Sequence, residues 1–268
     1  MKVLVLSGGA AAGADQIGRV KALLEAGNKY DAIVGTSVGA INGAAISHLG
    51  IEKAEEIWRG LKGFGSVMKF NIFKNPLQWD GLTEFAPLRE LLTMNLAGRT
   101  QTMDVYAVWL DICKNEVMHT NLEGLPIDTK VETILASSAI AGLNSPHEPI
   151  EGTCGLDGGH RDFAPVDFAM NILKADQVDI VITSTVERKE SKWTRWKYFP
   201  VLGILFRVLG IMIEEVAYSD WLYLKNDPRV RIFGPKKAVS LGMINYSPDE
   251  IKSTIDSAYN ETKEELGL

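Results

Sequence analysis

Residues 31–39 read Asp-Ala-Ile-Val-Gly-Thr-Ser-Val-Gly, an apolar run that ends in a serine between two glycines. The run is typical of a buried strand, and the apolar residues over 38–49 recur at the spacing of a helix. A serine on such a turn is lifted out of the sheet with its hydroxyl exposed, and Gly35 and Gly39 give the backbone room to turn sharply. The stretch indicates a nucleophile elbow at Ser37, and an ordinary glycine-rich turn is the alternative interpretation.

A second glycine-rich loop follows the first apolar run of the chain. Residues 3–6 predict a strand, residues 7–13 a loop of small residues, and residues 17–24 the apolar face of a helix. The loop lacks the Lys-Ser/Thr pair of a Walker loop, and Ala10 departs from a dinucleotide-binding fingerprint. Both loops leave the carboxyl ends of neighbouring strands, so we expect this loop to supply an oxyanion hole beside Ser37. The residues assigned to it are Gly8, Gly9, Ala10 and Gly13.

Strand and helix patterns alternate along the rest of the chain. Strands are predicted at 103–112, 117–120, 178–186 and 229–233, with a short one ending at Asp157. Helices are predicted at 51–61, 88–96, 129–137, 165–173 and 247–266, and residues 63–87 predict a long irregular segment or short helices. This alternation predicts an α/β fold in three layers, with a mostly parallel central sheet covered by helices on both faces. No repeat or low-complexity linker marks a boundary, so we expect a single domain over 1–268.

Composition narrows the function classes. The chain has 268 residues, of which 46% are hydrophobic, and its formal net charge of −6 argues against general nucleic-acid binding. The two cysteines, Cys113 and Cys154, imply no disulfide framework and fit a reducing compartment. The apolar run at residues 3–6 is too short for a secretion signal. We therefore expect a cytoplasmic protein.

A serine nucleophile needs a base, and Asp157 is the leading candidate. It is followed by Gly158 and Gly159, which let the backbone turn sharply and leave the carboxylate unshielded. A carboxylate within hydrogen-bonding reach of Ser37 can take its proton directly. The alternative interpretation of Asp-Gly-Gly is a plain turn.

The histidines offer a second choice of base. His48 lies on the same predicted helix as Ser37, about 16 Å away at 1.5 Å per residue, and is excluded. His147 and His160 stay open, although neither has an orienting carboxylate at a telling spacing. Together with Cys154 and Asp157 they match no common zinc pattern, so we expect no metal and no cofactor.

Taken in order, these segments resemble the patatin-like phospholipases, lipid acyl hydrolases that use a Ser–Asp dyad. The resemblance covers most of the chain and rests on residues 6–9, 13–23, 35–40, 137–140, 157–159 and 165–166. It implies a patatin-like fold, with Ser37 as nucleophile and Asp157 as base. It also implies that N–H groups of the Gly8–Gly13 loop form the oxyanion hole.

The chain departs from the family pattern at three positions. The first family loop usually reads Gly-Gly-Gly-x-Arg/Lys-Gly, whereas this chain has Ala10 at the third glycine and Ala12 at the basic residue. Alanine still supplies an N–H group but disfavours positive φ, and the loss of the basic residue removes a positive charge. Ala141 stands where the family commonly has proline.

An aromatic and basic stretch precedes a second apolar run. Residues 192–199 read Lys-Trp-Thr-Arg-Trp-Lys-Tyr-Phe, and the apolar run 200–213 is too short to span a membrane and contains Arg207. Tryptophans flanked by cations are typical of an interfacial anchor. We expect peripheral membrane contact through Trp193, Trp196, Phe199 and the helix that follows them. A buried core helix or a lid is the alternative.

The leading functional hypothesis is a lipid acyl hydrolase of the phospholipase A type, acting on membrane phospholipid or another acyl lipid. The alternative is a catalytically impaired membrane- or lipid-binding protein on the same fold, suggested by Ala10 and Ala12. A third reading is a hydrolase of soluble esters or thioesters, which applies if residues 199–213 are core.

Overall fold

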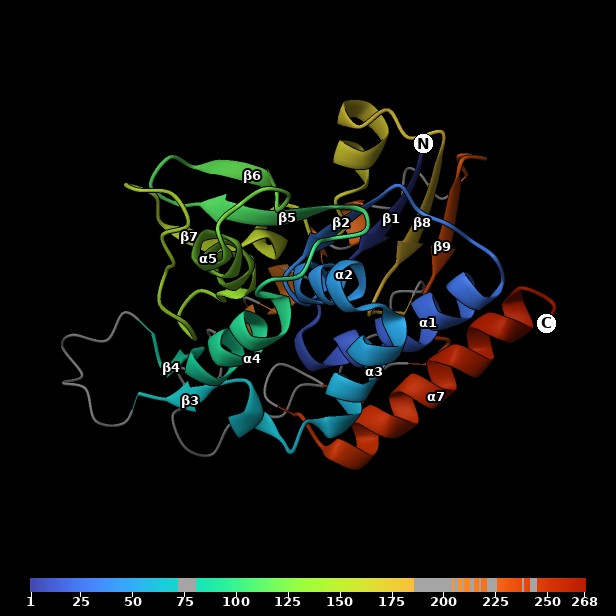
Figure 1. Cartoon of the computed structure of the whole chain (residues 1–268), viewed down its shortest axis with the longest axis horizontal. Coiled ribbons are helices and arrows are strands. Elements are labelled where there is room, and N and C mark those ends of the chain that lie inside the picture. The colour runs from blue at the N-terminus through green and yellow to red at the C-terminus, as the bar shows by residue number, and fades with distance from the viewer. Residues whose placement is uncertain are drawn as a thin grey trace.

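The computed structural model describes residues 1–71, 81–185, 204, 207–208, 210–212, 215–216, 218–220, 226–237, 239–241 and 245–268. Within these ranges the strands form a seven-stranded sheet of order β6-β5-β2-β1-β8-β9, in which β7 also pairs with β5. Its strands are β1 (Lys2–Leu6), β2 (Ala32–Thr36), β5 (Asp104–Asp111), β6 (Glu116–Asn121), β7 (Gly155–Asp157), β8 (Gln177–Val181) and β9 (Val230–Phe233). The pairings are parallel except for β6 and β7, which run antiparallel to β5 (Figure 1).

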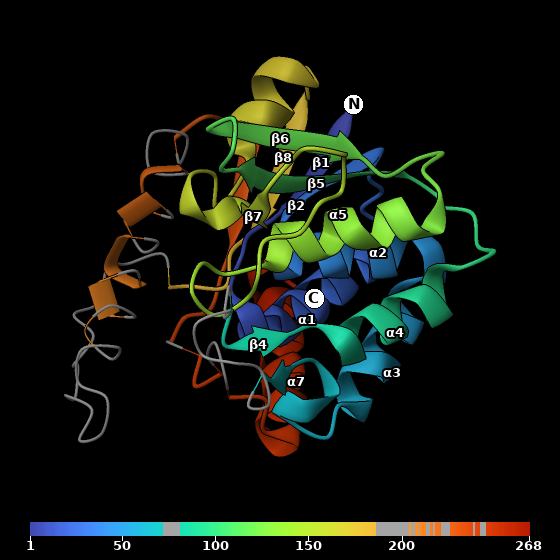
Figure 2. The same ribbon diagram turned by 90° about the vertical axis from the view of Figure 1, so that its left-hand side faces the viewer.

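The long helices gather on one face of this sheet (Figure 2). They are α1 (Gly13–Glu25), α2 (Val38–Leu49), α3 (Ile51–Gly60), α4 (Ala86–Leu96), α5 (Ile127–Ser138) and α7 (Pro248–Glu265). Leu4 and Leu6 of β1 point into the core beneath these helices. Val3 and Val5 point into a second core, which the segment 164–175 covers from the other side. Successive strand residues alternate between faces, so one apolar strand supplies both cores. The predicted three-layer α/β fold with a mostly parallel sheet is confirmed.

Several element boundaries differ from the predicted ones. β8 ends at Val181 rather than at residue 186, since the N–H of Thr183 donates to Ser7 Oγ instead of to a strand. α5 begins at Ile127, directly after a proline, and not at a capping box two residues later. Glu132, the expected capping residue, bonds His147 instead. The segment after Pro165 contains a π-helical turn at Phe168–Ile172.

Part of the predicted irregular segment 63–87 is ordered. β3 (Lys69–Phe70) and β4 (Thr83–Glu84) form a two-stranded antiparallel sheet beside α4. Residues 72–80, between these strands, lie outside the described residues.

The two cysteines form a disulfide, which the sequence analysis did not expect. Cys113, in the turn between β5 and β6, is bonded to Cys154, which directly precedes β7. Asp111 supports the same junction, because its Oδ1 accepts the N–H groups of both cysteines at 3.1 Å. Two cysteines that lie far apart in the sequence do not by themselves indicate a disulfide. The antiparallel pairing of β7 with β5 brings them together.

The C-terminal helix α7 lies along the first helix, α1 (Figure 1). A Cβ on Gly18 of α1 would lie 2.2 Å from the carbonyl oxygen of Ile255, so glycine permits this close approach. The fully buried guanidinium of Arg19 donates to Asp15 on its own helix and to Glu261 of α7. A buried charge with these partners makes the α1–α7 contact specific, since removal of a partner leaves the charge unpaired.

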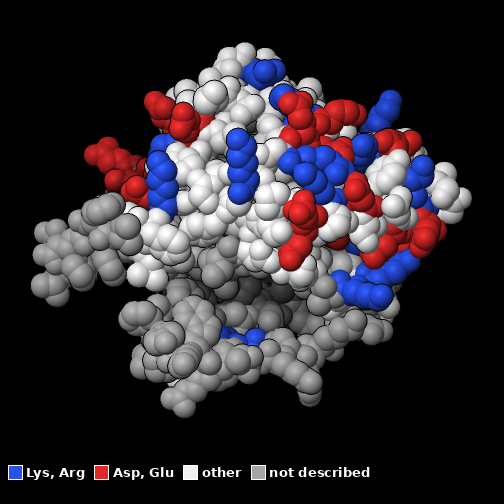
Figure 3. Space-filling model, turned by 90° about the horizontal axis from the view of Figure 1, so that it is seen from below, with Lys and Arg blue, Asp and Glu red and all other residues white. Residues whose placement is uncertain are grey.

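The described surface carries interspersed charges. Figure 3 shows lysine and arginine alternating with aspartate and glutamate on the face seen from below. Among the described residues, no helix is both long and apolar enough to cross a membrane. The predicted interfacial residues Trp193, Trp196 and Phe199 lie outside the described part of the chain.

Candidate active site

Two strands meet end to end along β5, and the candidate nucleophile and base lie at their junction. The last residue of β2, Thr36, pairs with Val108 in parallel register. The last residue of β7, Asp157, pairs with Trp109, the next residue of β5, in antiparallel register. Because β6 occupies the opposite edge of β5, β2 and β7 approach each other along the same edge. Ser37 directly follows β2, so the topology brings it to Asp157.

Ser37 has a strained backbone at the turn from β2 into α2. Its φ is 57° and its ψ is −124°, a combination that residues with a side chain rarely adopt. A Cβ on Gly35 would lie 2.3 Å from the carbonyl oxygen of Gly39, and a Cβ on Gly39 would lie 2.2 Å from that of Leu6. Close backbone contacts on both sides therefore hold the serine in this conformation and require the two glycines.

The carboxylate of Asp157 is buried beside the hydroxyl of Ser37. Its Oδ1 accepts the N–H of Gly159 at 2.7 Å. Burial raises the pKa of Asp157 above its ordinary value, although the hydroxyl of Ser37, the nearby charge of His160 and the N–H of Gly159 lower it in part. A carboxylate with a raised pKa is a better proton acceptor for a serine hydroxyl.

The histidines are engaged elsewhere. Nδ1 of His160 lies 2.6 Å from the backbone oxygen of Asp157, and Nδ1 of His147 lies 2.6 Å from Glu132. His48 contacts the carbonyl of Ala44, and His119 contacts Asp162. The Ser37 hydroxyl acts on the carboxylate of Asp157, and among the described residues no bond from an imidazole to Ser37 is found. The structure thus brings together the Ser–Asp pair of the two alternatives.

The alternative set of metal ligands is not assembled. Cys154 is bonded to Cys113, and His147 is paired with a glutamate. Within the described ranges, no three His, Cys, Asp or Glu side chains lie close enough together to hold a metal ion.

The loop after β1 lies at the same end of the sheet as Ser37, because β1 and β2 are parallel neighbours and both turns follow their carboxyl ends. Gly9 has φ 145° and Ala10 has φ 49°, so the alanine occupies the left-handed region that favours glycine. The N–H of Gly8 donates to the carbonyl of Phe163 at 3.1 Å, and that of Gly13 donates within the loop. Within the described part of the chain, no acceptor is recorded for the N–H groups of Gly9 and Ala10. Of the four predicted loop residues, these two therefore have donors to offer a ligand.

The first turn of α2 supplies a third donor. The N–H of Val38 follows the nucleophile at the start of the helix, where backbone donors have no partner within the helix. In acyl-transfer sites with a nucleophile elbow, this N–H and one from a second loop form the oxyanion hole. The positive end of the α2 dipole points at the same place.

Sequence reasoning assigned no role to Ser137, which holds the nucleophile in place. Its Oγ accepts the N–H of Ser37 at 2.9 Å and donates to the carbonyl of Val108 at 2.6 Å. The side chain is fully buried and ties the elbow to β5 and α5. The signal available was the Ser137-Ser138 pair at the end of a predicted helix, but a pair of serines alone does not indicate which one bonds the elbow.

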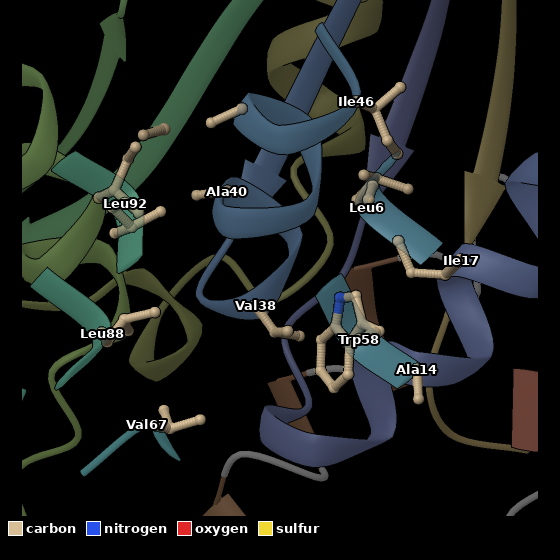
Figure 4. Close-up of a cluster of buried hydrophobic side chains, with 14 of the residues drawn as sticks. Leu6, Ala14, Ile17, Val38, Ala40, Ile46, Trp58, Val67, Leu88 and Leu92 are labelled. Atoms are coloured by element: carbon tan, nitrogen blue, oxygen red, sulfur yellow. The ribbon is translucent and has the colours of Figure 1, made fainter. Parts of the chain in front are cut away.

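A cavity opens at the serine. Ser37 and Ala10 lie at its wall together with side chains that are mostly apolar. Figure 4 shows four of them, Val38, Trp58, Val67 and Leu88, which come from α2, α3, the turn before β3 and α4. The remaining lining residues are Ile41, Ile57, Leu61, Met68, Phe85, Leu91, Ser138, Ile140 and Tyr246. A lining of this apolar character suits a hydrocarbon chain.

The backbone at Phe163 and Ala164, which follows the turn after Asp157, contacts the oxyanion loop and is held in place by Asp220. Phe163 accepts the N–H of Gly8, and its ring would lie 2.8 Å from a Cβ placed on that glycine. The carboxylate of Asp220 accepts the N–H groups of Phe163 and Ala164 at 2.7 and 3.0 Å. Burial raises the pKa of Asp220 to about 7, and nearby Asp162 adds to the rise.

The fold and the site define a class, a three-layer α/β protein with a serine elbow facing a buried carboxylate. A family model described as Patatin-like phospholipase matches residues 4–170, and the chain belongs to this family. The family resemblance of the sequence is thereby confirmed.

One solved structure supports the same fold. The chain is similar to VipD from Legionella pneumophila, with a TM-score of 0.55 and 15% sequence identity, covering 99% of this chain. It spans 66% of the length of that chain. At this identity the likeness shows the fold alone. No curated protein matches the chain.

Proposed function

We propose that the protein is a lipid acyl hydrolase of the phospholipase A type, with Ser37 as nucleophile and Asp157 as base. The observation that carries this proposal is the placement of Ser37, at the wall of an apolar cavity, beside the buried carboxylate of Asp157. Family membership supports an acyl-lipid substrate. The cavity accommodates the acyl chain, which leaves the ester carbonyl at the serine.

The reaction has two halves. Ser37 Oγ attacks the ester carbonyl while Asp157 takes the hydroxyl proton, and N–H groups of Gly9, Ala10 and Val38 stabilise the oxyanion. The tetrahedral intermediate collapses, the bond to the leaving alcohol breaks, and Asp157 returns the proton to that alcohol. Asp157 then takes a proton from a water molecule as the water oxygen attacks the acyl carbonyl. The second tetrahedral intermediate collapses, the bond from Ser37 Oγ to the acyl carbon breaks, Asp157 returns the proton to Oγ, and the fatty acid leaves.

We also propose that the protein meets its substrate at a membrane surface. Ile204, Val208, Ile211 and Met212 are helical residues with exposed apolar side chains. Their spacing puts them on one side of a helix. Apolar side chains on one face of a surface helix favour insertion into the lipid interface. The contribution of Trp193, Trp196 and Phe199 stays a prediction.

The second candidate function is a lipid-binding protein with impaired catalysis. The observation that favours it is Ala10, which holds φ 49° in the loop where the family has glycine. A distorted donor position weakens the oxyanion hole, and one donor is worth on the order of a hundred- to a thousand-fold in rate.

The test is fatty-acid release from a panel of phospholipids and neutral lipids, measured by mass spectrometry. Wild type is compared with Ser37→Ala, Asp157→Asn and His160→Ala. We expect release by wild type and by His160→Ala, and none by the other two variants. Full activity of Asp157→Asn with loss in His160→Ala would replace the dyad by a histidine mechanism. Liposome binding without release by any folded form would favour the lipid-binding alternative.

A further inference from the structure

Three buried polar side chains connect the oxyanion loop, the nucleophile helix and the cavity wall. Asn42 of α2 donates through Nδ2 to the carbonyl of Gly13 at 3.0 Å and to Gln16 Oε1 at 2.8 Å. Nε2 of Gln16 donates to the carbonyl of Ser7 at 2.7 Å. Oδ1 of Asn42 accepts the indole N–H of Trp58 at 2.8 Å.

The two amides hold both ends of one loop. Ser7 and Gly13 are the first and last residues of the loop that offers the oxyanion donors, and each gives its carbonyl oxygen to this network. Gln16 and Asn42 are fully buried. In each of these side chains the amide nitrogen donates and the amide oxygen accepts, and the network has four hydrogen bonds in all. A fully satisfied buried network of this kind fixes one arrangement of its members.

The loop needs such support because its backbone is strained. Gly9 and Ala10 have positive φ, a region that disfavours the Cβ of alanine. A strained loop keeps its conformation only when its surroundings determine it. Gln16 on α1 and Asn42 on α2 hold the loop in this conformation. Ser37 lies at the start of α2, so the same helix also positions the nucleophile.

The third member faces the substrate space. The ring of Trp58 lines the cavity, and Figure 4 shows it beside Val38 and Ala14, between α2 and α1. The same side chain that would contact an acyl chain therefore donates to the amide that holds Gly13. A ligand that packs against the indole restricts its motion, and the restriction reaches the loop through Asn42.

We propose that Gln16, Asn42 and Trp58 form a relay that positions the oxyanion loop and tightens it when an acyl chain fills the cavity. The proposal rests on the proposed function, because it assigns the cavity to the acyl chain. All three are positioning residues, and none touches the reacting atoms. The relay makes the enzyme most active on esters whose acyl chain reaches Trp58, so chain length acts on kcat as well as on KM.

The first test does not depend on turnover. Amide hydrogen exchange of residues 8–13 is measured with and without decanoate, a single-chain ligand for the cavity. We expect decanoate to slow exchange of the loop in wild type about tenfold and to leave it nearly unchanged in Trp58→Phe, which keeps an aromatic wall but lacks the N–H. Equal protection in both proteins, or no protection in wild type, would overturn the relay.

The matched control is Tyr30→Phe. It removes one buried hydrogen bond, from Tyr30 to Asp179, near the amino ends of the strands and away from the site. Gln16→Met removes the donor to Ser7 with little change in length. We expect faster loop exchange in Gln16→Met and Trp58→Phe but not in Tyr30→Phe. A loop that responds equally to all three would show a general loss of stability rather than a relay.

The second test uses acetyl and decanoyl esters of one chromogenic alcohol. We expect Trp58→Phe to lower kcat for the decanoyl ester about tenfold and to lower kcat for the acetyl ester by a clearly smaller factor. A change in KM alone would make Trp58 a wall residue and overturn the relay. Absence of turnover in wild type, with decanoate protection intact, would contradict the proposed function and leave the relay standing.

Discussion

Ser37 directly follows β2 and Asp157 ends β7, and these two strands run toward each other along one edge of β5. The pairing of Thr36 with Val108 and of Asp157 with Trp109 sets this geometry through the backbone. The two side chains are therefore placed by the register of the sheet rather than by a flexible loop. Substitutions that preserve this register should preserve the pair.

The pH dependence of hydrolysis should report the ionisation of Asp157. The base works only when ionised, and burial raises its pKa, so kcat/KM falls as pH falls through that raised value. We expect the acid limb of the profile above the 3.8 of an ordinary aspartate. His160→Ala should keep the limb and move it to higher pH, because a nearby positive charge that lowers the pKa is removed. A limb that vanishes in His160→Ala would contradict this assignment.

Ala10→Gly should relieve strain in the oxyanion loop. The alanine has φ 49°, a conformation that destabilises a residue with a Cβ by about 1–2 kcal/mol. Glycine adopts this φ without the steric cost but loses more conformational entropy on folding. We expect unchanged or slightly raised stability in urea and a rise in kcat. Ala11→Gly is the control, because Ala11 is fully buried in the same turn and has no positive φ. Its expected result is a loss of about 1 kcal/mol. Equal losses in both variants would contradict the strain argument.

Gly39→Ala should destabilise the elbow. The added Cβ would lie 2.2 Å from the carbonyl oxygen of Leu6, and backbone atoms cannot yield cheaply. We expect a loss of about 2–3 kcal/mol in the free energy of unfolding. Gly60→Ala, also at a helical glycine, meets nothing within 4 Å and should raise stability by up to about 1 kcal/mol. Thermal unfolding of the two variants distinguishes local crowding from a general effect of alanine.

Reduction of the Cys113–Cys154 disulfide should lower stability and activity together. The bond closes a loop with a sequence separation of 41, for which the chain-entropy model gives about 4 kcal/mol. Cys154 directly precedes β7, the strand that carries Asp157. We expect dithiothreitol to lower the urea midpoint of wild type but not that of the double serine variant. Identical midpoints for oxidised and reduced wild type would contradict a stabilising role.

Asp220 should make stability decline as pH rises. Its pKa is about 7 in the folded protein against 3.8 in the unfolded chain, so the folded state binds more protons between these values. The free energy of unfolding therefore falls with rising pH through this window. Asp220→Asn keeps an acceptor for Phe163 and Ala164 but does not ionise. Relative to wild type, it should gain about 2 kcal/mol between about pH 5 and about pH 8.

A companion variant checks the cause of that shift. Asp162→Asn, with Asp220 kept, removes the neighbouring negative charge and should lower the pKa of Asp220. The pH at which stability declines should then be lower than in wild type. Stability curves of wild type and Asp220→Asn that run parallel over this range would contradict the assignment.

The strongest sequence signals came from elements whose local pattern and tertiary role agree. The run before Gly35, the first strand and the last helix, with proline at its first position, are all found near their predicted places. The two strands are buried on both faces and therefore read as continuous apolar runs, whereas the last helix buries one face at a helical period, so both patterns can be recognised in the sequence. The family motifs then located Ser37 and Asp157.

The missed features depend on contacts between distant segments. The capping box at residues 129–132 was wrong because Glu132 serves His147 and Arg89, and these hydrogen bonds outweigh its burial and lower its pKa to about 2. The disulfide depends on the pairing of β7 with β5 over three residues. No local sequence pattern predicts which strand β7 pairs with. The bond from Ser137 to the elbow likewise needs the register of α5 against β2.

The contact between α1 and α7 has a consequence for how the protein is made. The oxyanion loop and α1 leave the ribosome before the helix that covers Gly18 and binds Arg19. Until α7 docks, the guanidinium of Arg19 lacks part of its charge partner and the backbone at Gly18 is uncovered. During synthesis α1 therefore passes through a stage at which a charge destined for burial has no partner on a second helix, and its final packing waits for a segment far along the chain.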